Sequence, residues 1–171
     1  MKFKTWKTIK LGTGLKTTED FSRALNKIGG CHISRGCYPQ VNTIFESSNF
    51  RSTQENIEVD LVNVSADDLG FSTGARCRDI YSRAQELGLI PCPGEVGPQL
   101  CLQFKDQLIN EGVDVSIGME SVLTTPGPSW KRIFSILDLF INNGELVLAA
   151  INGGPGSPWA RSNRFVFLKP R

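Results

Sequence analysis

His32 is the single histidine of this chain, and it lies directly after Cys31 and five residues before Cys37. A cysteine thiolate beside an imidazole base is a common nucleophile, and the same three side chains are soft ligands of the kind that hold zinc. Adjacent side chains in an extended segment point apart, so only Cys37 could reach His32, across a turn at Arg35–Gly36. A zinc site would also need a fourth ligand and closer cysteine spacing, and the sequence offers neither. We therefore expect no metal and no cofactor, and we interpret the cysteines as buried apolar side chains.

Asp138 is the other residue whose surroundings could support catalysis. It interrupts the apolar run Arg132–Ile141, which we predict to be a central strand. A carboxylate inside such a strand needs a partner or has a raised pKa, and its partner would come from a neighbouring strand. The alternative is a solvated carboxylate at one end of the sheet. A small enzyme that uses Cys37 and His32, or Asp138, is thus one hypothesis, although the residues favour a protein that is not an enzyme.

The residue types that recognise other molecules gather in the last third of the chain. The glycine-rich segment 152–163 ends in a tryptophan, an arginine and an asparagine, and a similar aromatic and basic pair precedes the central strand. Tryptophan and arginine anchor protein interfaces, because they give a large contact area and planar donors. They could equally stack on bases and contact phosphates, or the tryptophan could close one end of the core. The candidate binding residues are Trp130, Arg132, Trp159, Arg161, Asn163 and Arg164.

The periodicity of apolar residues predicts the elements that would carry these side chains. Thr17 and Asp20 resemble a capping box for a helix that ends at Gly29–Gly30, and a second helix is expected from Thr73 to Gly88. Alternation predicts strands near residues 5–11, 57–64, 100–104, 113–119, 132–141, 146–151 and 164–169. Asn143–Gly144 is a typical hairpin turn between two of them.

These elements predict an α+β fold in a single domain, residues 1–171. Its core would be a mainly antiparallel β-sheet of about seven strands, with two helices in the N-terminal half packed on it. Residues 31–55 show no sustained period, and we expect a long flexible connection there, with a short strand near Val41–Phe45.

Composition limits the classes of function. The chain has 171 residues, 40% of them hydrophobic, and a formal net charge of +2, which is too small to indicate nucleic acid or an anionic membrane. Its apolar runs are too short to span a bilayer, and the N-terminus lacks the apolar stretch of an export signal. Five cysteines, an odd number, fit reduced thiols. We therefore expect a cytoplasmic protein that does not contact the membrane.

Three stretches of sequence resemble a known family. WKTIKLGTGLKTTEDF near the start, DIYSRAQELGLIPCPGEVGPQLCLQFKDQ in the middle and RFVFLKPR at the end look like a family of uncharacterised small bacterial proteins, found mostly in reduced-genome bacteria. The family has no established activity, so the resemblance implies no catalytic or binding residue. It does imply a loop-rich C-terminal third that is diversified between copies. The chain departs from the family pattern between Leu108 and Trp130.

These observations favour a non-catalytic binding or interaction protein. Its loops at residues 124–130, 142–145 and 152–163 would contact an unknown protein or ligand. Nucleic-acid binding through the same tryptophan and arginine residues is the first alternative, and the small enzyme is the second.

Overall fold

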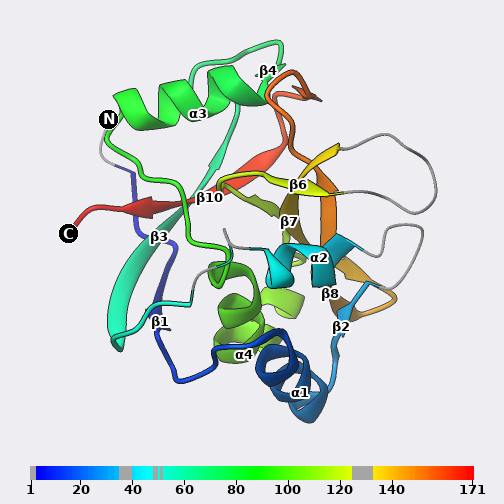
Figure 1. Cartoon of the computed structure of the whole chain (residues 1–171). Helices are drawn as coiled ribbons and strands as arrows, with labels where there is room; N and C mark the ends of the chain where they lie inside the picture. Colours follow the sequence, from blue (N-terminus) through cyan, green and yellow to red (C-terminus); the bar gives the residue numbers. More distant parts are fainter. Residues whose placement is uncertain (1–2, 35–39, 48–49, 51, 125–132) are drawn as a thin grey trace.

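The computed structural model describes residues 3–34, 40–47, 50, 52–124 and 133–171, and it is an α+β fold (Figure 1). The helices of this described part are α1 (Thr18–Ile28), α2 (Gln40–Glu46), α3 (Cys77–Glu86) and α4 (Val96–Asn110). The strands are β1 (Lys7–Leu11), β2 (Cys31–Ile33), β3 (Ile57–Ser65), β4 (Ala75–Arg76), β5 (Asp114–Ile117), β6 (Val122–Thr124), β7 (Ile133–Asn142), β8 (Glu145–Asn152), β9 (Pro158–Trp159) and β10 (Arg164–Lys169).

The main sheet is mixed, which corrects the prediction of a mainly antiparallel sheet. Its eight described strands run in the order β1-β3-β10-β5-β7-β8-β2, with β6 paired to β7, while β4 and β9 form a separate two-stranded sheet. Most neighbours are antiparallel, but β10 with β5 and β2 with β8 are parallel. Parallel pairs join segments that lie far apart in the sequence, so local alternation of residues carries no signal for them.

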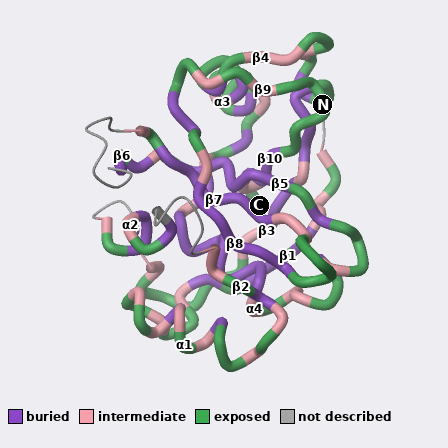
Figure 2. The backbone as a smooth tube through the Cα atoms, turned by 90° about the vertical axis from the view of Figure 1, so that its right-hand side faces the viewer, coloured by how far each residue is buried: buried purple, intermediate pink, exposed green. Residues whose placement is uncertain are grey.

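Two apolar clusters pack against the sheet, one on each face of β3 and β10. Leu61 and Val166 belong to the larger cluster with α1, α2 and α4, whereas their neighbours Val62 and Phe167 belong to the smaller one with α3. Figure 1 shows α3 apart from the other three helices, at the end of the molecule that carries β4. The middle strands β7 and β8 are buried along most of their length (Figure 2).

Two local predictions are confirmed in detail. The side chain of Thr17 accepts a hydrogen bond from the backbone of Asp20, and the Asp20 carboxylate accepts one from the backbone of Thr17, so α1 begins with a capping box. The turn between β7 and β8 places Asn143 and Gly144 at φ of 51° and 80°, as a tight hairpin turn requires.

The prediction of two helices is wrong, because the described chain has four. The segment 100–104, expected as a strand, lies inside α4, whose one non-helical residue is Phe104, with φ −134° and ψ 16°. The short strand expected at Val41–Phe45 is instead the helix α2, and its side chains at Val41, Ile44 and Phe45 are buried in the larger cluster. The helix α3 begins at Cys77 rather than near Thr73.

Helix α4 lies along β1 and satisfies polar groups on it. Gln103 accepts from the backbone N–H of Lys10 and donates to its carbonyl oxygen, at 2.9 and 2.8 Å. Two turns later the ammonium of Lys7 donates to Gln107 and to Glu111, which also accepts from the indole of Trp6. The helix thereby occupies backbone groups of an edge strand that would otherwise be open to pairing with another chain.

Candidate binding site beside helix α3

A pocket of about 210 Å³ lies where α3 meets the C-terminal loop. Its lining comes from three segments: the first turns of α3, the link between β5 and β6, and the loop after β8. The lining residues are Cys77, Arg78, Tyr81, Met119, Glu120, Ser121, Gly153 and Pro155. Cys77 and Tyr81 are four residues apart, so they share one face of the helix.

Hydrogen bonds between backbone and side chain hold these three segments together. Tyr81 Oη donates to the carbonyl oxygen of Met119 at 2.8 Å, which ties α3 to the link before β6. The first two N–H groups of α3, at Cys77 and Arg78, donate to the carbonyl oxygens of Ser157 and Pro155 at 2.9 and 3.1 Å. These donors have no acceptor within a helix, so the loop satisfies the helix end and is fixed by it.

Gly153 allows the loop to close on the sheet. A Cβ atom at this position would lie 2.5 Å from Cγ2 of Ile136 on β7. Only glycine fits so close an approach, and the pocket wall depends on it.

The polar groups inside the pocket are not prepared for catalysis. Burial raises the pKa of the Cys77 thiol to about 11, and the nearby Trp159 indole offsets only a part of this effect. Burial also raises the pKa of Tyr81 well above its usual value. Both groups are neutral near pH 7, and a thiol with such a pKa is a poor nucleophile. The floor of the pocket is therefore apolar in character.

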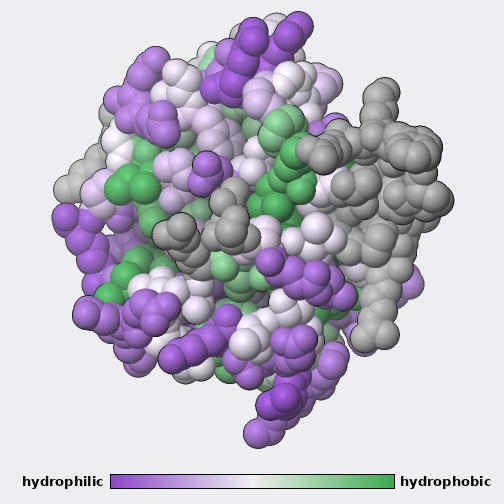
Figure 3. Space-filling view, viewed as in Figure 1, coloured by the Kyte–Doolittle hydropathy of each residue, from purple (hydrophilic) through white to green (hydrophobic). Residues whose placement is uncertain are grey.

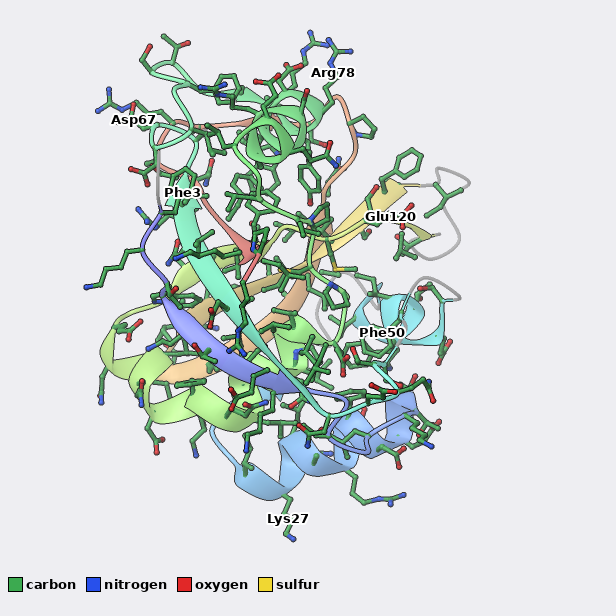
Figure 4. The ribbon with its side chains drawn as sticks, turned by 90° about the vertical axis from the view of Figure 1, so that its left-hand side faces the viewer. Phe3, Lys27, Phe50, Asp67, Arg78 and Glu120 are labelled. Atoms are coloured by element: carbon green, nitrogen blue, oxygen red, sulfur yellow. The ribbon has the colours of Figure 1, made fainter. Side chains whose placement is uncertain are left out.

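Exposed apolar side chains continue the surface of the pocket onto β6 and β7. Leu123 and Phe134 are opposite each other on these strands, and their side chains are 44% and 43% exposed. The N–H of Gly153, a lining residue, donates to the carbonyl oxygen of Phe134 at 2.9 Å, so this pair adjoins the pocket. Figure 3 shows hydrophobic surface gathered over the region of β6, next to the residues drawn in grey. Arg78 and Glu120 lie at the edge of the pocket, one from α3 and one from the link before β6 (Figure 4).

Most of the predicted binding residues that the structure describes are engaged within the protein. The indole of Trp159 packs edge-on against Phe165, with ring centroids 5.0 Å apart, and its Nε1 is buried. Arg164 donates through Nε to Asn63 Oδ1 at 2.7 Å, and Asn163 Oδ1 accepts from the backbone of Ala160. Arg161 is exposed. Trp130 and Arg132 lie outside the described residues.

The histidine is paired on the surface. His32 Nε2 lies 2.7 Å from Glu145 Oε2, and both side chains are more than half exposed. Cys37 lies outside the described residues, so the proposed pair of Cys37 and His32 stays a prediction. Within the described part of the chain, no group of three or more histidine, cysteine or acidic residues could hold a metal ion.

Asp138 has the partner expected from a neighbouring strand. Ser116 on β5 donates to its carboxylate at 2.8 Å, and both residues are buried. Burial raises the pKa of Asp138 to about 6, the serine hydrogen bond opposes this shift, and the charge of Asp114 adds to it. Asp138 is absent from the lining of the pocket beside α3.

The raised pKa of Asp138 predicts a pH-dependent stability. The folded state favours the neutral carboxyl, so this contribution is fully present below the ordinary pKa of 3.8 and is lost as the pH rises through about 6. Asp138→Asn should therefore stabilise the protein by up to about 3 kcal/mol at pH 7.5 and by almost nothing at pH 4. Urea denaturation of both proteins at the two pH values measures the difference, in which the effects of other carboxylates cancel. A difference that does not change with pH would contradict the assignment.

Comparisons with protein-family models, curated proteins and solved structures found no match to this chain. The resemblance to a bacterial family therefore stays a prediction. No helix in the described part of the chain is long and apolar enough to cross a membrane.

The pocket was not foreseen from the sequence, although the loop that forms one wall was. Its lining residues come from positions 77–81, 119–121 and 153–155, and nothing local links these three stretches. The spacing of Cys77 and Tyr81 is the one signal that could have suggested a shared helix face.

Proposed function

We propose that this chain is a non-catalytic binding protein and that the pocket beside α3 receives an apolar side chain of a partner protein. The observation that carries the proposal is the continuity of the pocket with the exposed pair Leu123 and Phe134. An apolar pocket bordered by exposed apolar side chains is the usual form of an interface centre. The proposal moves the contact from Trp159, expected from the sequence, to the surface beside it.

The size and charges of the site favour a protein partner over a small free ligand. A volume of about 210 Å³ fits a single large side chain, whereas pockets for drug-sized ligands usually hold about 300–1,000 Å³. The apolar surface continues beyond the pocket, so a partner that extends past it would bury more area. Arg78 and Glu120 carry opposite charges at the edge, and they could orient such a partner without demanding a strongly charged one.

A selection from a displayed peptide library tests the proposal with the whole protein as bait. We expect enriched peptides to share a large apolar residue. Their affinity should fall roughly tenfold or more in Phe134→Ser and in Leu123→Ser, since each removes apolar area next to the pocket. Ser121→Phe, which places a ring at the pocket wall, should block binding without loss of the fold. Fluorescence polarisation with a labelled peptide gives the affinities.

The matched control is Ile57→Ser on β3. Ile57 is 41% exposed, close to the values for the two test residues, and it does not line the pocket. Its replacement should leave peptide affinity unchanged. The proposal fails if no peptide is enriched, or if the control variant weakens binding as much as the test variants do.

A further inference from the structure

Two buried cysteines meet between β2 and α4. Cys31 begins β2, Cys101 lies in α4, and both belong to the larger apolar cluster, at 3% and 0% exposed. The two thiols interact directly, and the interaction with the Cys101 side chain is the largest cause of a lowered pKa at Cys31. Cys101 has the opposite response, because burial raises its pKa well above the usual value. The pair therefore has one thiol that ionises more easily and one that stays protonated.

Lys105 places a positive charge beside this pair. It lies one helical turn after Cys101, on the same face of α4. Its Nζ donates to the carbonyl oxygen of Ile28 at 3.1 Å, and its Cδ lies 3.6 Å from the position that a Cβ on Gly30 would take. These contacts bring the ammonium to the start of β2, where its charge also lowers the pKa of Cys31. A cation next to a thiol increases the fraction of thiolate, which is the form that reacts with oxidants.

We infer that Cys31 and Cys101 form a redox pair that closes to an intramolecular disulfide when the protein meets a peroxide. The Cys31 thiolate attacks one peroxide oxygen, the O–O bond breaks, and hydroxide leaves. The Cys31 sulfur is then a sulfenic acid. The Cys101 sulfur attacks it, and the thiol proton and the sulfenic hydroxyl leave as water. Two thiols are oxidised to one disulfide, and one peroxide is reduced to two molecules of water.

The position of β2 gives the oxidant a way in. This strand has three residues, lies at the edge of the sheet and is preceded by Gly29 and Gly30, both at positive φ. A short edge strand after two glycines opens at lower cost than a strand inside the sheet. Closing the disulfide would then fix this edge of the sheet to α4.

The other described cysteines lack these features. Burial raises the pKa of both Cys77 and Cys92, and their thiols donate to the carbonyl oxygens of Gly153 and Val166. Neither has a second cysteine as an interaction partner among the described residues. The pair of Cys31 and Cys101 should therefore react first.

Peptide mapping after oxidation tests the inference. The reduced full chain is treated with hydrogen peroxide at pH 7, the remaining thiols are blocked with N-ethylmaleimide, and the protein is digested with trypsin. We expect a disulfide between peptides 28–35 and 84–105. The second peptide also contains Cys92, so the experiment uses the Cys92→Ser variant to make the assignment unique.

Further variants separate a redox pair from accidental oxidation. In Cys101→Ser, Cys31 should stop at the sulfenic acid, which dimedone traps, while Cys77→Ser should leave the disulfide unchanged. Lys105→Met should slow its formation roughly threefold to tenfold, the effect of raising the Cys31 pKa by about half a unit to one unit, and Lys105→Arg should keep the rate. The inference is overturned if Cys31 links to Cys37, if no link to Cys101 forms, or if Lys105→Met and Lys105→Arg react equally fast. The lysine variants keep the test valid should Cys101→Ser fold poorly.

Discussion

Replacing Glu95 by alanine is expected to lower the free energy of unfolding by about 3–5 kcal/mol, because two buried donors lose a charged acceptor and a cavity is left. Glu95 is 0% exposed and stands at the start of α4. Its Oε1 accepts from the backbone N–H of Thr53 at 2.7 Å, and its Oε2 accepts from that of Gly12 at 3.4 Å. Urea denaturation of the wild type and the variant at pH 7 measures the loss.

Two controls show whether the carboxylate itself carries this effect. Glu95→Gln keeps one acceptor oxygen in nearly the same volume, so its cost should be about half that of the alanine variant. Asp106→Ala, also on α4, removes a carboxylate that is 88% exposed, and it should change stability by less than about 0.5 kcal/mol. Equal losses in Glu95→Ala and Asp106→Ala would contradict the role assigned to Glu95.

Glu95 is the first of a stripe of polar residues that joins α4 to the N-terminal strand. The stripe repeats every four residues, and its members bond to successive groups between Trp6 and Thr13. Four-residue spacing keeps side chains on one helix face, so a single helix can serve the full length of β1. The residues of the stripe are Glu95, Gln99, Gln103, Gln107 and Glu111.

The same stripe explains why the sequence misled us about α4. Leu100, Leu102 and Phe104 alternate with polar residues, and prolines and glycines stand just before them, so a strand was predicted. The polar spacing and the apolar residues Val96, Leu100 and Leu108 both follow a helical period, and together they cover a longer segment. A period sustained over fifteen residues is stronger evidence than an alternation over five, and weighing the two by length would have found the helix.

Elements that depend on neighbouring residues were predictable, and those that depend on distant ones were not. The capping box of α1 and the Asn143–Gly144 turn are set by backbone conformation and hydrogen bonds within a few residues. The parallel pairing of β2 with β8 joins Cys31 to Leu146, and no local pattern specifies that distance. The pocket has the same origin, since its three walls meet only after the sheet has formed.

The candidate binding residues show the limit of inference from residue type. Tryptophan and arginine are common in interfaces, but they are equally suited to structural roles when the fold supplies partners. Arg164 holds the side-chain and backbone oxygens of Asn63, so its planar donors are used within the protein. The partners lie a hundred residues away in the sequence, which is why the composition of the loop alone could not distinguish the two roles.

Trp159 gives the sharpest test of this distinction. Its indole contacts both apolar clusters and packs against Phe165, so Trp159→Ala should lower the free energy of unfolding by about 3–5 kcal/mol. Thermal and urea denaturation measure the loss. The sequence alone suggested the opposite outcome, an exposed anchor whose removal leaves stability unchanged.

Trp159→Phe separates the packing of the ring from its N–H group. Nε1 is buried and has no acceptor in the described part of the chain, so phenylalanine removes an unsatisfied donor while it keeps most of the ring area. We expect a cost of no more than about 1.5 kcal/mol, well below that of alanine. We also expect peptides selected on the pocket to bind Trp159→Phe with unchanged affinity, because Leu123 and Phe134 form the contact surface. If the phenylalanine variant is stable and yet loses the peptide, the indole N–H itself binds the partner, and the contact surface proposed here must include Trp159.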